Sequence, residues 1–266
     1  MAAGNGEMNS LERMLSLLEV FTPAAPVWSM DDLIQYAGVS RSTCYRQVRA
    51  LQGAGLLTRV GQSAYMLGPA VIELDRSIRV SDPIYLAGAA PMRSLCRATG
   101  QTVILCVLYS GAVMCVREEI GVDAPVGSFS RGQKRPLFTA AASKVILAQL
   151  PAHQLRRLYA RHRTDIAKAG LGADWDGFRA ALRKIRDAGH CVTVGEFTPG
   201  IVGIAAPIFN RSGQVLGSLG IAMASSPDRR RHQPRLVESV TAAAAKVTEG
   251  IAAHAHADVL PARAVG

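Results

Sequence analysis

The sequence predicts an α+β chain, with an N-terminal winged helix-turn-helix followed by a larger domain built on an antiparallel sheet. Two observations support this fold class. Short amphipathic helices and one hairpin occupy residues 1–67, and β-rich runs interspersed with longer helices occupy residues 81–254. We expect a linker helix over 68–80 and a flexible tail over 255–266.

The composition indicates a folded protein without a membrane span. With 266 residues, 49% of them hydrophobic, the chain is long enough for two cores and is not mainly disordered. No apolar run approaches the roughly 18 residues that cross a bilayer, and the first residues lack the blocks of a signal peptide. We therefore expect a cytoplasmic protein with no membrane partner. Its five cysteines lack CxxC spacing and are expected to be reduced core residues.

The net charge of +10 fits a polyanionic partner, but its distribution makes it weak evidence. Between Ser29 and Met66 there are four arginines and two aspartates, so this segment is only slightly basic. Much of the excess lies in 154–163 and 228–235, where we expect solvated helix faces and loops. The local pattern must therefore identify the partner.

The first elements are expected to be two short helices. Over 11–21, "LERMLSLLEVF" has apolar residues at helical spacing, and "TPAAP" ends it. Ser29 is an N-cap for the second helix, Asp32 completes a capping box, and Gly38 ends the helix.

The next helix, over 40–51, reads "SRSTCYRQVRAL" and is expected to pack on the second. Ser40 is its N-cap, and Cys44, Val48 and Leu51 share one side. Two helices joined by a tight turn form a helix-turn-helix. After it, "LLTRV" and "AYML" predict two short strands around the turn "GQS", which is the hairpin of a winged form.

The exposed side of helix 40–51 carries the residues that DNA recognition requires. Arginine can bind guanine through two hydrogen bonds in the major groove, and serine can bind bases or phosphates. Ser42 and Arg46 point away from the buried side and are the expected base contacts. The expected phosphate contacts are Arg41, Thr43, Tyr45 and Arg49 in the helix, with Arg59 and Gln62 in the wing reaching the backbone or minor groove. The alternative is that the polar side of this helix is simply the solvent-exposed surface of a small all-helical domain.

The second domain is expected to alternate helices with antiparallel strands. Its first part is expected to contain helices within 68–100, interrupted at Pro83 and Pro91, then a hairpin over 101–120 and a loop over 121–136. Three helices are expected next, over 137–150, 153–163 and 175–188. The last elements are expected to be strands over 190–197, 203–210 and 214–223 and a helix over 235–254.

Both halves resemble the IclR family of bacterial transcriptional regulators. The N-terminal half matches its "LERxLxLLExF" and "SxxxLxxxxGxSxSTxYRxxxxLxxxGLL" motifs with "LERMLSLLEVF" and "SMDDLIQYAGVSRSTCYRQVRALQGAGLL". The C-terminal half matches with "RGQKRPLFTAAASKVILAQL" and "GIVGIAAPIFNRSGQVLGSLGIA". Together these resemblances cover residues 10–252.

The resemblance implies a GAF-like effector-binding domain. A small organic ligand would lie between its sheet and the loop and helix after the long crossover, and would bias the DNA-binding domains of a homodimer or homotetramer on double-stranded operator DNA. Such regulators, repressors among them, commonly control catabolic genes and need no cofactor. The alternative hypothesis is a small-molecule-binding protein or enzyme whose N-terminal helices serve only in assembly.

The departures from the family pattern predict a less polar pocket. Phe138 replaces a histidine, and small or apolar residues replace polar ones on the strands. We expect an apolar ligand, aromatic compounds and acids included, with the backbone amides near Ala141 and Ala142 available to a carboxylate. The expected pocket residues are Gly127, Phe129, Leu137, Thr139, Ala141, Ala142, Ser143, Thr193, Ile201, Gly203, Gly220 and Ala222. Alternatively, the small residues only let the sheet and helix pack closely.

No pattern in the sequence supports an enzyme or a metal site. GxSxG, GxxxxGK[ST] and GxGxxG are missing from any strand-to-helix setting. Adjacent Glu118 and Glu119 would face opposite sides of a strand, so they would not form a carboxylate pair. His254 and His256 have no partnering cysteine or acid, so we expect no metal there.

Overall fold

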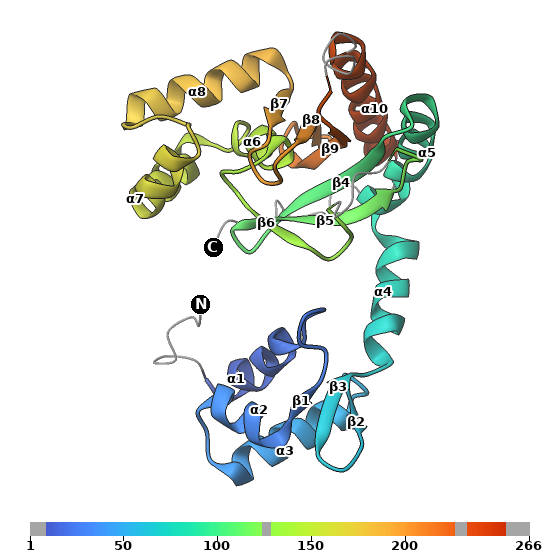
Figure 1. Cartoon of the computed structure of the whole chain (residues 1–266), viewed down its shortest axis with the longest axis vertical. Coiled ribbons are helices and arrows are strands. Elements are labelled where there is room, and N and C mark those ends of the chain that lie inside the picture. Colours follow the sequence, from blue (N-terminus) through green and yellow to red (C-terminus); the bar gives the residue numbers. More distant parts are fainter. Residues whose placement is uncertain (1–8, 124–128, 227–232, 254–266) are drawn as a thin grey trace. The chain divides into compact units, whose positions relative to one another are not determined.

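The computed structural model describes residues 9–123, 129–226 and 233–253 and divides the chain into two compact units, Met1–Val80 and Ser81–Gly266 (Figure 1). The N-terminal unit comprises α1 (Ser10–Ser16), the 3-10 helix η1 (Leu17–Val20), β1 (Trp28–Ser29), α2 (Met30–Ala37), α3 (Arg41–Gly53), β2 (Leu57–Val60), β3 (Ala64–Leu67) and α4 (Ala70–Ser81). This is the expected winged helix-turn-helix, and the helix expected over 68–80 is α4.

The helix ends in this unit form through local interactions. The Ser29 hydroxyl accepts the Asp32 N–H at 3.1 Å, and the Asp32 carboxylate accepts the Ser29 N–H at 3.3 Å, which is the expected capping box. Gly38 ends α2 with φ +62°, and the Ser40 hydroxyl accepts the Thr43 N–H at 3.3 Å to begin α3.

Two features of the N-terminal unit differ from the expectation. The first helix was expected to run to Phe21, but α1 ends at Ser16 and the chain continues as η1. The sequence also did not predict β1, which pairs Trp28 with Tyr65 and makes the wing a three-stranded sheet of order β1-β3-β2. A two-residue strand has no periodicity of its own, so only its pairing defines it.

The C-terminal unit is built on one antiparallel sheet of order β6-β5-β4-β9-β8-β7. Its elements are α5 (Pro83–Thr99), β4 (Thr102–Tyr109), β5 (Ala112–Glu119), β6 (Lys134–Pro136), α6 (Ala141–Leu147), α7 (Ala152–Lys168), α8 (Trp175–Ala188), β7 (Cys191–Val194), β8 (Ile201–Phe209), β9 (Val215–Ala224) and α10 (Gln233–Ala253).

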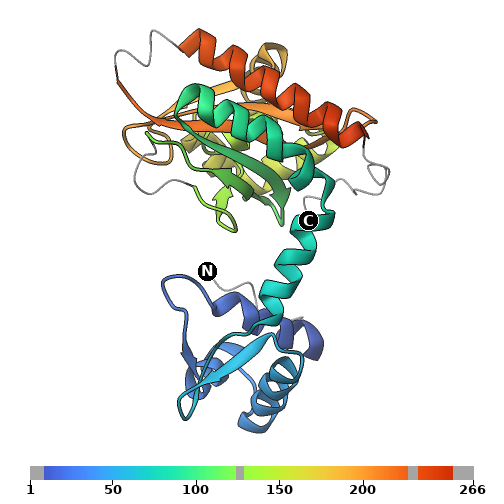
Figure 2. The same cartoon turned by 90° about the vertical axis from the view of Figure 1, so that its right-hand side faces the viewer.

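Helices cover both faces of this sheet. Figure 2 shows α5 and α10 side by side on one face, and α6 packs on the other, with α7 and α8 outside it. Alternate residues of β4 enter the two cores: Val103 and Leu105 face α5 and α10, whereas Ile104 and Cys106 face α6. The sheet is therefore buried on both faces at its centre.

Three expectations for the C-terminal unit need correction. Residues 121–136 were expected to be a loop, but Lys134–Pro136 forms β6, because its backbone pairs with β5. Pro91 lies inside α5 instead of separating two helices. The helix expected over 153–163 extends to Lys168, with non-helical backbone angles at His162.

The tail 255–266, His254 and His256 lie outside the described residues. Among the helices of the described ranges, none is long and apolar enough to cross a bilayer.

Close packing at Gly220 predicts a stability effect. A Cβ atom added there would lie 2.6 Å from the Ile204 carbonyl oxygen, so the backbone itself would have to move. We expect Gly220→Ala to lower the free energy of unfolding by about 1–3 kcal/mol in urea titrations. Gly53→Ala is the control, because nothing lies within 4 Å of its added Cβ. Equal stability of the two variants would contradict this packing argument.

Candidate functional site

The buried side of α3 fixes its orientation in the N-terminal core. Cys44 and Val48 are completely buried and Leu51 is 2% exposed, as predicted. Gln47 is also buried, and its side-chain N–H groups donate to the Ser10 carbonyl at 3.2 Å, which the sequence pattern did not predict. The opposite side of α3 must therefore face outward.

The predicted DNA-contact residues are accessible. Arg41, Ser42, Tyr45, Arg46 and Arg49 are exposed on α3, Thr43 is half-buried, and Arg59 and Gln62 are exposed on the β2–β3 hairpin. Ser42, Arg46 and Arg49 are spaced by four and three residues, so they share one face of the helix. This face combines two exposed arginines with the hydroxyl of Ser42.

Arg41 has a protein partner that the sequence did not reveal. Its guanidinium donates to the Asp31 carboxylate at the start of α2 and lies 5.9 Å from the centre of the Tyr45 ring. Both charged side chains are exposed, at 64% and 78%, so this ion pair is weak. A DNA phosphate could replace Asp31 at small cost.

In the C-terminal unit, a cavity lies between α6 and the sheet. Its lining includes seven predicted residues, which are Ala141, Ala142, Thr193, Ile201, Gly203, Gly220 and Ala222. The other residues that line this cavity were not predicted from the sequence; they are Ile104, Arg135, Ala140, Glu196, Phe197, Thr198, Ile204, Ala205 and Ile221. The cavity volume is only about 30 Å³, which is room for about two water molecules.

Close packing explains much of this small volume. A Cβ atom added at Gly203 would lie 3.3 Å from the Thr193 hydroxyl oxygen and 3.5 Å from the Ala141 Cβ. The Ser218 hydroxyl donates to the Ala142 carbonyl at 3.0 Å across the same interface. At Gly203 a side chain would crowd the Thr193 hydroxyl, whereas its distance to Ala141 would be that of an ordinary contact. Both interpretations of this glycine, ligand contact and close packing, therefore stay predictions.

The amides at the start of α6 are already engaged. The Ala141 N–H donates to the Thr193 hydroxyl at 3.1 Å, and the Ala140 N–H donates to the Glu196 carboxylate at 3.1 Å. The Ala141 amide is therefore not free for a ligand carboxylate, contrary to the sequence-based expectation. Ala140 has φ +71° and ψ 157°, a conformation that costs a non-glycine residue about 1–3 kcal/mol.

Glu196 also neutralises a buried cation. Lys144 is 5% exposed, and its ammonium lies 2.7 Å from the Glu196 carboxylate and 3.0 Å from the Ala169 carbonyl oxygen, to which it donates. One carboxylate on the β7–β8 connection thus joins the strained start of α6 to the only buried lysine of the described residues.

Arg135 is the cationic cavity residue that the sequence did not predict, because 121–136 was expected to be a loop. Its guanidinium lies 4.0 Å from the centre of the Phe129 ring and 4.3 Å from that of Phe197. Burial lowers the pKa of Arg135 from its ordinary value. Phe129, a predicted ligand contact, is buried and lies against Arg135.

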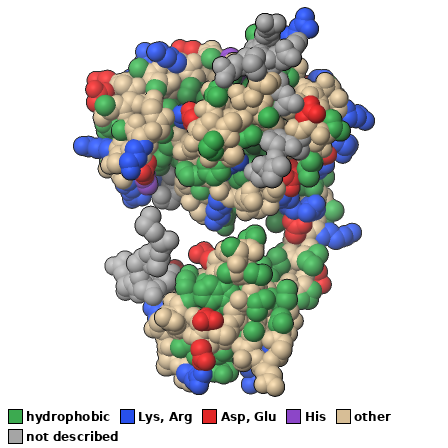
Figure 3. Space-filling view, viewed as in Figure 1, with side chains coloured by type: hydrophobic (Ala, Val, Ile, Leu, Met, Phe, Trp, Pro, Cys, Tyr) green, Lys and Arg blue, Asp and Glu red, His purple; other side chains and the backbone are tan. Residues whose placement is uncertain are grey.

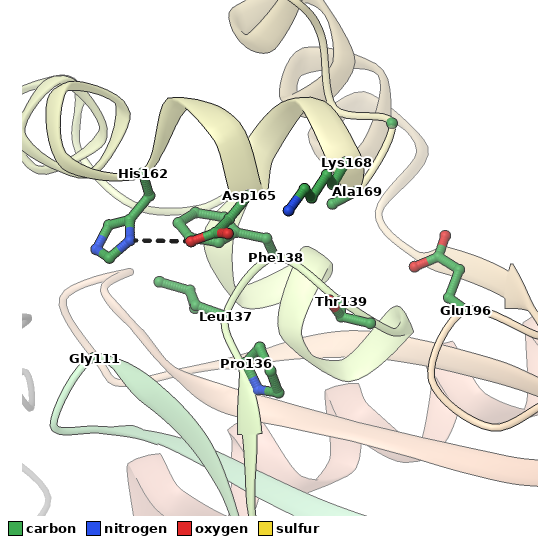
Figure 4. Close-up of a pocket in the computed structure, with 11 residues that line it drawn as sticks. Gly111, Pro136, Leu137, Phe138, Thr139, His162, Asp165, Lys168, Ala169 and Glu196 are labelled. Atoms are coloured by element: carbon green, nitrogen blue, oxygen red, sulfur yellow. Dashed lines mark ion pairs between the residues drawn. The ribbon is translucent and has the colours of Figure 1, made fainter. Parts of the chain in front are cut away.

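Two predicted pocket residues lie on a different hollow. Leu137 and Thr139 line a space of about 700 Å³ between the β6–α6 connection and α7 (Figure 4). His162 and Asp165 form an ion pair at 3.5 Å at one side of it, and Glu196 lies at the other. Most of its polar lining is exposed, so it is a surface hollow rather than an enclosed ligand cavity.

Two predicted pocket residues remain, Ser143 and Gly127. Ser143 is buried, and its hydroxyl has no hydrogen-bond partner among the described residues. Gly127 lies outside the described ranges.

The described parts of the chain contain free cysteines and no metal cluster. Cys44, Cys106, Cys115 and Cys191 are buried and Cys96 is half-buried, and all five are free thiols. In these ranges no group of three His, Cys, Asp or Glu side chains could hold a metal ion.

A winged helix-turn-helix with an exposed cationic helix, followed in sequence by a GAF-like domain with an internal cavity, defines the class of two-domain DNA-binding regulators. The IclR helix-turn-helix domain matches residues 10–61, and the bacterial transcriptional regulator IclR C-terminal domain matches residues 80–249. The chain belongs to the IclR family of bacterial transcriptional regulators.

Individual relatives agree with this family. The chain is 26% identical over 260 residues to the transcriptional repressor IclR of Escherichia coli, covering 89% of this chain and 86% of the relative. An IclR regulator from Alicyclobacillus acidocaldarius superposes with a TM-score of 0.77 at 24% identity, covering 92% and 99% of the chains. An IclR homologue from Microbacterium hydrocarbonoxydans, solved with 4-hydroxybenzoate, gives 0.75 at 20% identity, covering 91% and 98%.

The burial of Cys191 predicts low reactivity in the folded protein. Burial raises its pKa from 9.0 to about 12. We expect iodoacetamide at pH 8 to leave Cys191 unmodified in the native protein and to modify it in guanidinium, as read by peptide mass spectrometry. The contribution of Cys191 to stability is complete below pH 9.0 and is lost as the pH rises toward about 12. Equal modification rates in the two states would contradict its burial.

Proposed function

We propose that this chain is a ligand-responsive transcriptional regulator that binds operator DNA through α3 and a small organic effector through its C-terminal unit. The observation that carries the DNA-binding half is the two-sided character of α3. One side is fully buried, and the other presents Ser42, Arg46 and Arg49 on one face. A major groove accommodates one helix with such a face.

The proposed DNA contacts are of two kinds, to base edges and to phosphates. Ser42 and Arg46 contact base edges, since a guanidinium can bind guanine through two hydrogen bonds. Phosphate contacts position the helix and come from Arg41, Thr43, Tyr45 and Arg49, with Arg59 and Gln62 of the wing reaching the backbone or minor groove.

We propose that the chain acts as a homodimer or homotetramer. Within α4, Ile72, Leu74, Ile78 and Val80 are exposed, Ile72 by 73%. Leu11 and Leu15 of α1 are exposed as well, and Figure 3 shows hydrophobic side chains gathered on the face of the N-terminal unit that it draws. Such apolar surface is typical of a protein interface, and pairing would place two α3 helices on a pseudo-palindromic operator.

We propose that the effector occupies the cavity between α6 and the sheet. Its walls are small and apolar at Ala141, Gly203, Gly220 and Ala222, which suits an aromatic or otherwise apolar organic compound. The homologue solved with 4-hydroxybenzoate supports this class of ligand. Regulated genes for the catabolism of such a compound would be the corresponding targets.

Regulation requires that the effector distinguish two arrangements of the protein. A ligand shifts an equilibrium only by its difference in affinity for the two states. A coupling of about 1–3 kcal/mol would change operator affinity by 5- to 150-fold, which suffices for a switch.

Arg46→Ala tests the DNA-binding half of the proposal. We expect operator affinity to fall by about 1–3 kcal/mol, because a bidentate base contact is lost, in gel-shift titrations against the gene's own upstream region. Arg179→Ala is the matched control, since Arg179 is an exposed arginine on α8. If Arg46→Ala binds the operator as the control does, Arg46 is not a base contact and the proposed mode of DNA recognition is wrong. If wild type itself does not bind the operator, the N-terminal helices serve assembly only, and the chain is a small-molecule-binding protein or an enzyme.

Thermal-shift measurements test the effector half. We expect a member of a panel of aromatic and aliphatic acids, 4-hydroxybenzoate included, to raise the melting temperature, because ligand binding to the folded state stabilises it. The same compound should change operator affinity in gel shifts, whereas panel members without a thermal shift should not. A compound that raises the melting temperature and leaves operator affinity unchanged would contradict ligand-responsive regulation.

A further inference from the structure

Arg135 occupies an unusual position for a cation in the proposed effector cavity. It lies in β6 opposite Val113 of β5, and it is half-buried. Phe129 and Phe197 stack on it, with ring centres 4.0 Å and 4.3 Å from the guanidinium carbon. Rings stacked on a guanidinium fix its plane and leave its in-plane N–H groups to make hydrogen bonds.

These in-plane donors lack an anionic partner among the described residues. The Arg135 Nε atom is completely buried and has no hydrogen-bond acceptor there. The one carboxylate that lines the same cavity belongs to Glu196, and it is bound by Lys144 at 2.7 Å and by the Ala140 N–H at 3.1 Å. The thiol of Cys106 nearby is protonated, since its pKa is raised well above the ordinary value.

A cation in such surroundings favours an anionic ligand. Burying a charge without a counter-charge is costly, and a carboxylate matches the paired N–H groups of a guanidinium. Most of the other lining residues are apolar, including Ile104, Ile201 and Ala222, with Thr193 and Thr198 as neutral polar residues. We infer that the effector is an organic carboxylate with an apolar body, and that Arg135 binds its carboxylate. This inference rests on the proposed effector site and specifies its ligand class.

The ligand must displace part of the β7–β8 connection to enter. The cavity of about 30 Å³ is too small for an aromatic acid, and Phe197, which covers one face of Arg135, is 48% exposed. Gly195 and Gly200 bound this segment with φ +67° and +76°, so it turns at both ends through glycines. Moving Phe197 opens the cavity beside Arg135 and also moves Glu196.

Matched acids and amides test the inference. The probes are benzoate, phenylacetate and cinnamate with their three neutral amides, and binding is measured by calorimetry on the full chain. Wild type should bind at least one acid more tightly than its amide, and Arg135→Gln should weaken that acid by roughly 10- to 100-fold while leaving the amide unchanged. Lys134→Gln is the control, because Lys134 is the exposed neighbour in β6, and should keep the preference.

Arg135→Lys separates charge from structure. It keeps the cation, so we expect it to retain the preference for the acid at reduced affinity, and this holds even if Arg135→Gln fails to fold. A purely structural role would lower the melting temperature without changing the acid-to-amide ratio. The inference is wrong if no acid binds wild type more tightly than its amide, or if an Arg135 variant keeps the full wild-type affinity for the acid.

Operator binding distinguishes this failure from failure of the proposed function. Ligand-free wild type and Lys134→Gln should bind the upstream DNA equally, since β6 is not part of the winged helix-turn-helix. Equal operator binding without acid preference would overturn the role of Arg135 alone. Absence of operator binding by wild type would instead overturn the regulator function.

Discussion

The C-terminal unit depends on the close approach of α6 to the sheet. All seven residues of α6 are buried, and the strand residues facing it include Gly203 and Gly220. A side chain at Gly220 would collide with the backbone of the neighbouring strand, and one at Gly203 would crowd the Thr193 hydroxyl. This approach creates both the apolar core on that face and the small cavity beside it. It also requires the chain to enter α6 through the strained backbone of Ala140.

The contacts that hold this strained entrance connect the cavity to the β7–β8 connection. Glu196 accepts the Ala140 N–H and pairs with the buried Lys144, and it lies one residue from Phe197, which stacks on Arg135. A ligand that displaces Phe197 therefore also disturbs the counter-charge of Lys144. Because an uncompensated buried cation is costly, the cavity and the start of α6 are expected to change together rather than independently.

Sequence patterns predicted what neighbouring residues determine. Ser29, Gly38 and Ser40 act at helix ends within four residues of their partners, so the helix-turn-helix could be read directly. β1 and β6 could not be, because each is defined by pairing with a distant strand. Leu137 and Ala141 are only four residues apart, but Leu137 lines the surface hollow beside α7 and Ala141 lines the cavity under α6, because distant segments form the other walls of each. Arg135 was not predicted as a site residue, because its segment was expected to be a loop.

Charge in this protein is informative only together with burial. The net charge of +10 is a property of the whole chain, and exposed cations such as Arg179 are solvated and gain little from any one partner. Arg46 is equally exposed, and its position opposite the buried side of α3 is what directs it toward a large polyanion. Arg135 differs because its Nε is buried without an acceptor among the described residues, so it needs a partner small enough to enter the cavity. If both proposals hold, the same side-chain chemistry would select DNA at one position and a small carboxylate at the other.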